Sequence, residues 1–431
     1  MVYVERGEGL VLNLKNKKPM NIVHLVASDS GGAYRAAERI SDSLNRIGEN
    51  SIVVVLEKKR QGSNVYPFFN KKKFRLFVFK VVRKIESKKL KKMKLTSYFY
   101  ESSLGVNLYR MNEVKRADVI NIHWVNDGMV SYKELKRLCK SGKKVVWTMH
   151  DMFSFTAGCY YDQECGGYQN ECQNCPMVRN IKNGQKFIDC LYLKKKSAYI
   201  GEIGFIGCSR WISKCAQNST LLEKKAIITI PNPIDSGVFK PVGREDCYKL
   251  FPMVKNDANK NILFGAMMAT SDPRKGYKYL IEALKCIEEK DKYRLIVFGG
   301  SSDYTVPVDI ECVSVGSISN DDKLVALYSL ADVFVAPSLQ ENLSNAVMES
   351  LACGTPVAAF NIGGMQDLIC NGETGCLVDP FDEKMLSEAI QILAMKKGNF
   401  TYKCREKACR DFSMQRVGNA YRNFYLEDYT G

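Results

Sequence analysis

Two glutamates with seven residues between them, Glu341 and Glu349, are the clearest candidates for chemistry in this 431-residue sequence. They lie between two short apolar runs, Val333 to Ala336 and Val357 to Phe360. Such runs, separated by a polar turn and one helix, are typical of a βαβ unit in a covered parallel sheet. Ligands of these sheets bind at the carboxyl ends of the strands, where a helix N-terminus favours an anion. The sequence therefore places Glu341 to Ser344 at a candidate binding edge.

The same segment resembles the donor-binding core of retaining glycosyltransferase family 4. The hallmark of that family is a glutamate, seven residues and a second glutamate, followed by a Cys-Gly-Thr-Pro-Val-like strand entry, here Cys353 to Val357. Alone, two glutamates at this spacing are commonly solvated side chains of a helix face. Their strand, helix and glycine context makes this match specific, and the resemblance extends over residues 20–425.

The resemblance implies an α/β fold with two Rossmann-like domains facing across a cleft, the GT-B arrangement. In that arrangement Glu349 is expected to hold the ribose hydroxyls of a nucleoside diphosphate sugar. Glu341 is expected beside the donor sugar, where it stabilises an oxocarbenium-like transition state. Asn342, Leu343 and Ser344 would complete the donor site. The sugar would be transferred with retention to a hydroxyl of a glycan acceptor, with no catalytic cofactor, and the chain has no Asp-x-Asp motif.

Two cations, Arg274 and Lys275, follow an expected strand from Ile262 to Ala266. An arginine can meet a diphosphate as a planar fork and a lysine as a point charge. The resemblance assigns the pyrophosphate contact to Lys275. Many family members carry an arginine six residues before that lysine, whereas this chain has Ala269, so Arg274 would have to compensate. An ordinary basic pair on the surface is the alternative.

The first half of the chain also presents a glycine turn, Gly31-Gly32, directly after an expected strand from Asn21 to Ala27. Paired glycines let backbone N–H groups approach a ligand closely at the start of a helix. A tight turn without a ligand is the simpler interpretation. The resemblance places this turn opposite the second domain's site and favours donor binding.

Two of the three histidines, His123 and His150, end expected strands, which predicts that they are exposed at the cleft. The resemblance matches His150 to a residue that hydrogen-bonds the transferred sugar. His123 and Trp124 are expected on the acceptor side, where the indole offers a flat face to a sugar ring. A strand-end histidine that only caps a loop is the alternative.

Beyond His150, four cysteines lie within a span of 17 residues: Cys159, Cys165, Cys172 and Cys175. Four thiolates could hold a structural zinc and stiffen the polar loop that carries them, although only the last pair has the usual spacing. Free or packed thiols are the alternative. A similar loop occurs in the branch of the family associated with exopolysaccharide and capsule synthesis.

The net charge of +16 is concentrated between Lys71 and Lys94, which hold twelve basic residues and one acid, Glu86. Apolar residues at helical spacing draw one stripe along this segment: Phe74, Phe77, Val78, Val81, Val82 and Ile85. A basic amphipathic helix is typical of binding to an anionic membrane surface. Docking of the stripe on the protein's own sheet is one alternative, and nucleic acid is not expected because no nucleic-acid module accompanies the charge.

Length and composition fit two domains: residues 1–240 on the acceptor side, 241–410 for the nucleotide sugar, and a helix over 411–431 returning to the first domain. No apolar run is long enough for a transmembrane helix or a signal core, and sixteen cysteines fit a reducing compartment. We therefore expect a cytoplasmic protein, peripheral at the inner face of the membrane, acting on a glycan or polyprenyl-diphosphate-linked acceptor. An inactive glycan-binding subunit, a sugar-nucleotide epimerase or a phosphorolytic enzyme of the same fold are the alternatives.

Overall fold

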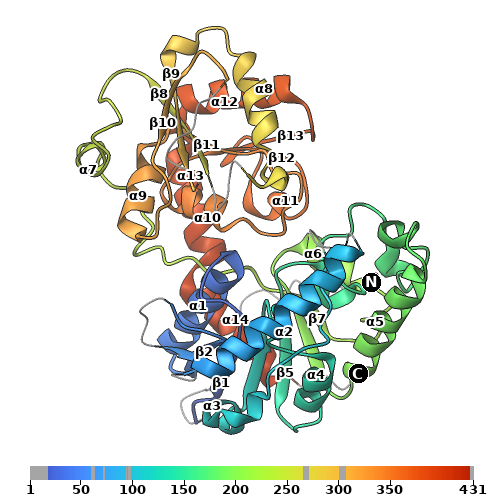
Figure 1. The fold of residues 1–431 in the computed structure, drawn as a ribbon. Helices are drawn as coiled ribbons and strands as arrows, with labels where there is room; N and C mark the ends of the chain where they lie inside the picture. The colour runs from blue at the N-terminus through green and yellow to red at the C-terminus, as the bar shows by residue number, and fades with distance from the viewer. Residues whose placement is uncertain are drawn as a thin grey trace.

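Two α/β domains, one above the other in Figure 1, make up the computed structural model of the chain. The structure describes residues 18–59, 64–70, 73–93, 95, 99–265, 271–299 and 307–427. Of the positions named above, Lys71, Lys94, Ala266 and Ala269 lie outside the described residues.

The first domain contains a seven-stranded parallel sheet in the order β3-β2-β1-β4-β5-β6-β7. Its strands are β1 (Asn21–Leu25), β2 (Asn50–Val55), β3 (Val65–Pro67), β4 (Val119–Ile122), β5 (Lys144–Met149), β6 (Ile203–Gly207) and β7 (Ile227–Thr229). Its helices are α1 (Gly32–Arg46), α2 (Lys73–Lys92), α3 (Asn112–Arg116), α4 (Tyr132–Cys139), α5 (Gly184–Ala198) and α6 (Arg210–Gln217). The central strands are buried on both faces, as their continuous apolar runs require.

The second domain contains a six-stranded parallel sheet in the order β10-β9-β8-β11-β12-β13. Its strands are β8 (Lys260–Gly265), β9 (Tyr293–Phe298), β10 (Glu311–Ser314), β11 (Val333–Ala336), β12 (Val357–Phe360) and β13 (Gly375–Val378). Its helices are α7 (Arg244–Leu250), α8 (Tyr277–Lys285), α9 (Asp321–Leu330), α10 (Asn345–Ala352), α11 (Met365–Leu368), α12 (Glu383–Met395) and α13 (Lys397–Phe412). The expected α/β architecture with two parallel sheets is confirmed.

The last helix, α14 (Met414–Leu426), leaves the second domain and packs on the first, against α1 (Figure 1). Its Tyr425 hydroxyl accepts a hydrogen bond of 2.7 Å from the Asn121 side chain in β4. Val417, Tyr421 and Phe424 fill the core between this helix and the first sheet. The C-terminus thus braces the two domains against each other.

In both sheets the strand order reverses beside the first strand, between β1 and β4 and between β8 and β11. Loops that leave neighbouring strands in opposite directions open a crevice at the carboxyl edge, where α/β proteins bind ligands. The Gly31-Gly32 turn follows β1, and Glu341 follows β11. The topology therefore brings the candidate residues of both domains to facing edges.

Helix α2 docks on the first domain by the face opposite to its predicted apolar stripe. Phe79 and Arg83 pack over Gly128, where an added Cβ would lie 2.8 Å from each side chain, and Leu90 is buried. Arg83 also donates hydrogen bonds to Tyr100 at 2.5 Å and to Asp127 at 2.6 Å. The packed face therefore holds α2 without using the stripe.

The described part of the stripe faces solvent: Phe77 is 65% exposed and Ile85 63%, while Val78, Val81 and Val82 are 39–44% exposed. The possibility that the stripe docks on the protein's own sheet is therefore wrong. Exposed Lys80, Lys84 and Lys91 lie along one flank of it. Among the described residues, no helix has the length and apolarity to cross a membrane.

Candidate active site

The site lies where the carboxyl edges of the two sheets meet, and the Gly31-Gly32 turn is its contribution from β1. Gly31 has φ +90°, a backbone conformation that glycine adopts readily, and α1 begins at the next residue. The carbonyl oxygen of Gly32 accepts a hydrogen bond of 3.1 Å from the Asn345 side chain at the start of α10. The glycine turn and the α10 N-terminus are thus in contact, as expected for residues that share one ligand.

Asn342 is an interdomain bridge. Its Oδ1 accepts a hydrogen bond of 2.6 Å from the Ser209 hydroxyl, and its Nδ2 donates one of 3.0 Å to the Met149 carbonyl. Leu343 is buried, and the Ser344 hydroxyl caps α10 by accepting from the Val347 amide. The side chains of these three residues are therefore engaged within the protein.

Glu341 and Lys275 form an ion pair, with Lys275 Nζ 2.7 Å from Glu341 Oε2. Both residues lie at the carboxyl edge of the second sheet. Gly276, with φ +70°, brings the turn that carries Lys275 against the Pro337 carbonyl, and a Cβ there would lie 1.7 Å from that oxygen. The turn after β8 is thereby fixed beside the end of β11, and the expected catalytic carboxylate and phosphate-binding cation meet.

Arg274 uses its guanidinium fork on its own turn. Its Nε donates to Asp272 Oδ1 at 3.0 Å and its Nη2 donates to Asp272 Oδ2 at 2.7 Å. The Arg274 guanidinium also lowers the pKa of the Asp272 carboxyl, against the effect of burial. The guanidinium lies 5.9 Å from the ring centre of Tyr161, which belongs to the first domain. Arg274 therefore reaches the first domain, with two of its donors directed to Asp272.

Glu349 is 4% exposed, and its carboxylate meets cations of the first domain. Arg39 Nη2, from α1, lies 2.6 Å from Glu349 Oε1, and Arg35 Nη1 lies 3.5 Å from the same oxygen. The Tyr328 hydroxyl donates to Glu349 Oε2 at 3.1 Å. The carboxylate expected to hold a ribose thus takes part in a buried contact between the two domains.

The three histidines of the chain form one hydrogen-bonded row. His24 Nδ1 lies 2.8 Å from His123 Nε2, and His123 Nδ1 lies 2.9 Å from His150 Nε2. His123 is 2% exposed, so the prediction that it is exposed at the acceptor side is wrong. Both of its ring nitrogens are used by the neighbouring histidines. Trp124 and His150 are half-buried, and His150 stands at the end of β5.

Burial changes the protonation of the groups around His150. Burial lowers the pKa of His150 to about 4 and raises the pKa of Asp151 to about 6. Burial also lowers the pKa of Lys195 to about 7. Its ammonium donates to the carbonyls of Phe153 and Thr156, which fixes the loop after β5. His150 is therefore a neutral imidazole at pH 7.

The four cysteines of the loop after β5 line one small cavity: Cys159, Cys165, Cys172 and Cys175. Backbone N–H groups point at two of the sulfurs, from Ala157 to Cys172 at 3.3 Å and from Gly167 to Cys165 at 3.4 Å. Over the residues that the structure describes, no three histidine, cysteine or carboxylate side chains are grouped as a metal site. Zinc binding would require the thiols to draw closer together, so the structural zinc stays a prediction.

Sequence reasoning missed Gly363, Gly364 and Arg39, which contact the candidate site residues. Gly363 and Gly364 lie against the carbonyls of Glu341 and Asn342, and an added Cβ would approach those oxygens to 2.0 Å and 1.8 Å. A glycine pair shortly after a buried strand was the available signal for this close approach. Arg39 carried no such signal, because its partner Glu349 is 310 residues away in the sequence.

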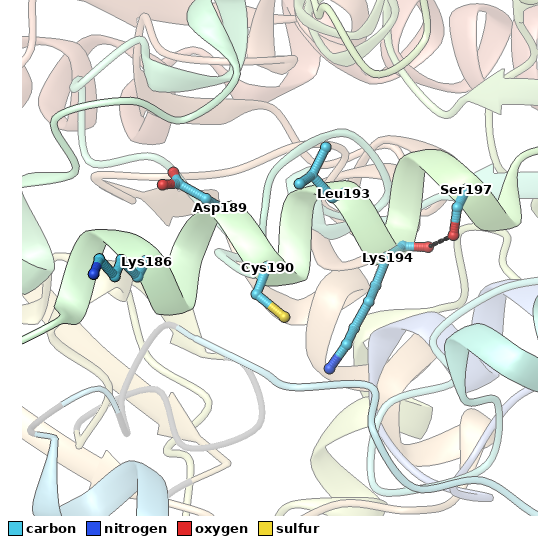
Figure 2. A pocket seen from close by; sticks show the side chains of 6 residues that line it. All are labelled: Lys186, Asp189, Cys190, Leu193, Lys194 and Ser197. Atoms are coloured by element: carbon cyan, nitrogen blue, oxygen red, sulfur yellow. Dashed lines mark hydrogen bonds between the residues drawn. The ribbon is translucent and has the colours of Figure 1, made fainter.

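A separate surface hollow of about 530 Å³ lies along α5. Figure 2 shows that its labelled side chains, among them Cys190 and Leu193, all come from this one helix. Among the described residues, the lining of this hollow comes from α5 alone, so no second element there supplies groups that converge on a ligand. The interdomain edge, where both domains supply polar groups, is therefore the candidate active site.

Most of the second domain matches the model of a known protein family. Residues 259–396 match the family model described as glycosyl transferases group 1. This segment is similar to the group 1 glycosyl transferases. It contains Lys275, Glu341 and Glu349.

Two curated relatives and one solved structure illustrate the similarity of the chain to glycosyltransferases. The D-inositol 3-phosphate glycosyltransferase of Corynebacterium diphtheriae is 34% identical over 133 residues, which cover 28% of this chain and 31% of the relative. The capsular polysaccharide biosynthesis glycosyltransferase CapM of Staphylococcus aureus is 26% identical over 226 residues, covering 50% and 58%. The matched regions thus span less than two thirds of these relatives.

The crystal structure of Anabaena HepE in complex with UDP and glucose superposes with a TM-score of 0.60. The match covers 94% of this chain and 99% of that chain, at 15% sequence identity. At this identity the likeness shows the fold, over the first domain as well as over the segment that matches the group 1 family model. The expected two-domain GT-B arrangement is confirmed.

Proposed function

We propose that this protein is a retaining glycosyltransferase that moves a sugar from a nucleoside diphosphate sugar to a hydroxyl of a glycan acceptor. The observation that carries the proposal is the contact between Glu341 and Lys275 at the edge where the two domains meet. These charges are complementary to a sugar donor. The lysine can meet its diphosphate, and the glutamate can meet the sugar that becomes positive in the transition state. The group 1 family match supports the reaction class.

In this proposal the second domain binds the nucleotide. Glu349 accepts hydrogen bonds from the ribose hydroxyls, which requires Arg39 to leave its oxygen. Lys275 moves from Glu341 to the diphosphate, and Arg274 and the N-terminus of α10 add positive potential as the leaving group gains charge. No catalytic metal is needed in this scheme.

Glu341, released from Lys275, stabilises the oxocarbenium-like transition state by its negative charge. His150 contacts the transferred sugar from the first domain. Closure of the domains excludes water and so favours transfer over hydrolysis.

We further propose that α2 binds an anionic membrane surface and that the acceptor is lipid-linked, at the inner face of the cell membrane. The exposed apolar stripe on α2 and the lysines beside it support this assignment. The similarity to CapM, named for capsular polysaccharide biosynthesis, supports a role in capsule or exopolysaccharide synthesis. Hexoses and N-acetylhexosamines are the proposed sugars.

The test is a panel of nucleoside diphosphate sugars, read by thermal shift and by release of nucleoside diphosphate in the presence of solubilised membrane lipid. One donor should stabilise both the wild type and Glu341→Gln, while only the wild type should turn it over. Stabilisation of neither protein by any donor would indicate a glycan-binding subunit. Conversion of a donor without an acceptor would indicate an epimerase, and formation of a sugar phosphate would indicate a phosphorolytic enzyme.

A further inference from the structure

The row of His24, His123 and His150 follows from the register of the first sheet. His24 pairs with Asn121 in the neighbouring strand β4, and Asn121 pairs with Val146 in β5. His123 lies two residues beyond Asn121, and His150 lies four beyond Val146. Because side chains two and four apart share one face of a sheet, all three imidazoles lie on the same face. They step across adjacent strands toward the carboxyl edge of the sheet.

Burial leaves each imidazole with one proton. His24 and His123 are 0% and 2% exposed. Burial lowers the pKa of His24 to about 3 and the pKa of His123 well below its usual range, the latter with help from the two neighbouring histidines. A neutral imidazole donates from one ring nitrogen and accepts at the other. The row can therefore hold its protons in only two ways, all on Nδ1 or all on Nε2.

The ends of the row distinguish these two arrangements. His24 Nε2 is buried and has no hydrogen-bond partner among the described residues. A proton there would be a donor without an acceptor, and buried N–H groups without acceptors are rarer in proteins than acceptors that lack a donor. Protons on Nδ1 avoid this, because each donates to the next ring and the last, on His150, points to Cys208 Sγ at 3.5 Å.

We propose that His24 and His123 are positioning residues that hold His150 as the Nδ1–H tautomer, a hydrogen-bond donor toward an oxygen of the bound sugar. The sugar contact rests on the proposed function, whereas the tautomer does not. A thiol is a weak acceptor, so a hydroxyl or ring oxygen can replace Cys208 as the partner of that N–H. His150 Nε2 stays bound to His123 throughout, which excludes His150 as a general base through that nitrogen.

The tautomer can be read directly, because the chain contains three histidines. The full-length protein, labelled with ¹⁵N-histidine, gives long-range nitrogen–proton correlations that report which ring nitrogen carries the proton. His150 should show Nδ1–H in the wild type. His24→Gln, whose amide can still donate to His123, should keep that pattern, whereas His24→Leu should populate both tautomers of His150. Nε2–H in the wild-type His150, or an identical spectrum in His24→Leu, would overturn the proposal.

Turnover supplies the second readout. His123→Leu should lower the turnover number about tenfold, the value of one neutral hydrogen bond, with the KM for the donor unchanged. His123→Gln should recover most of the loss, because its amide can donate and accept in the same place. Equal turnover by the leucine variant and the wild type would remove the positioning role. If no donor is turned over by the wild type, the proposed function fails, while the spectra still decide the tautomer.

Discussion

The exposed stripe on α2 makes a quantitative prediction for membrane binding. The perturbation is the double substitution Phe77→Ser and Ile85→Ser, at residues 65% and 63% exposed. Burying a whole side chain of this size in an apolar medium is worth about 2.5 kcal/mol, so the exposed part of each contributes about 1.5 kcal/mol. The two together amount to about 3 kcal/mol, or roughly a hundredfold in the partition coefficient.

The assay is co-sedimentation with vesicles of phosphatidylcholine containing or lacking phosphatidylglycerol. The control is Leu193→Ser on a different helix, α5, at a residue 61% exposed, which should bind as the wild type does. Since the replaced side chains are exposed, their effect on the free energy of unfolding should stay within about 0.5 kcal/mol. A loss of membrane binding could then not be attributed to unfolding.

The lysines beside the stripe give the second arm of the test. Lys84→Gln with Lys91→Gln should weaken binding to anionic vesicles by about 2 kcal/mol, or roughly thirtyfold, and leave binding to neutral vesicles unchanged. Added salt should reduce binding of the wild type more than that of this variant. If the Phe77→Ser, Ile85→Ser protein sediments with anionic vesicles as the Leu193→Ser control does, the assignment of α2 to a membrane is wrong.

Three further outcomes follow from buried groups. Arg39→Ala should lower the free energy of unfolding by about 3 kcal/mol, because it leaves the buried Glu349 carboxylate without its ion-pair partner. In chemical denaturation, the double variant Arg39→Ala, Glu349→Gln should lose less stability than the sum of the two single variants. The pKa of His24 is about 3 in the folded protein and about 6.5 in the unfolded chain, so below pH 6.5 unfolding takes up a proton. The free energy of unfolding should therefore fall with decreasing pH. Between pH 6 and 4 it should fall more steeply for the wild type than for His24→Gln, by about 1.4 kcal/mol per pH unit. If the cysteine loop holds zinc, elemental analysis should find one equivalent that Cys172→Ser with Cys175→Ser removes and that the exposed Cys190→Ser retains.

The sequence predicted the central strands and the binding edge because these depend on local pattern. A four-residue apolar run such as Val333–Ala336 presents apolar side chains on both faces of a strand, so it fits a strand that is buried on both faces of a sheet. The polar residues that follow such a strand then lie at the edge of the sheet. The helix and glycine between Glu341 and Val357 fixed the βαβ unit. Strands β10 and β13 were missed because β10 (Glu311–Ser314) is half-buried and both contain small or polar residues.

Contacts between distant segments could not be read in this way. The periodicity of α2 identified an apolar stripe but did not show which face of the helix would contact the rest of the protein. Phe79 and Arg83 make that contact, because Gly128 has no side chain and leaves room for them. His123 was expected at the surface because it ends a strand, yet its neighbours His24 and His150 bury it. The link between Arg39 and Glu349 depends on how two domains meet, which no local pattern records.

The central claim is that the pair Glu341 and Lys275 transfers a sugar from a nucleotide to an acceptor. The most direct measurement uses a donor labelled in its sugar, with solubilised membrane lipid as acceptor, and compares the wild type with Glu341→Gln and Lys275→Gln. We predict one nucleoside diphosphate released per sugar incorporated into the lipid fraction by the wild type. Glu341→Gln should lose the transfer and keep donor binding, while Lys275→Gln should lose both. Transfer by Glu341→Gln at the wild-type rate, or label recovered only as free sugar or sugar phosphate, would contradict the account.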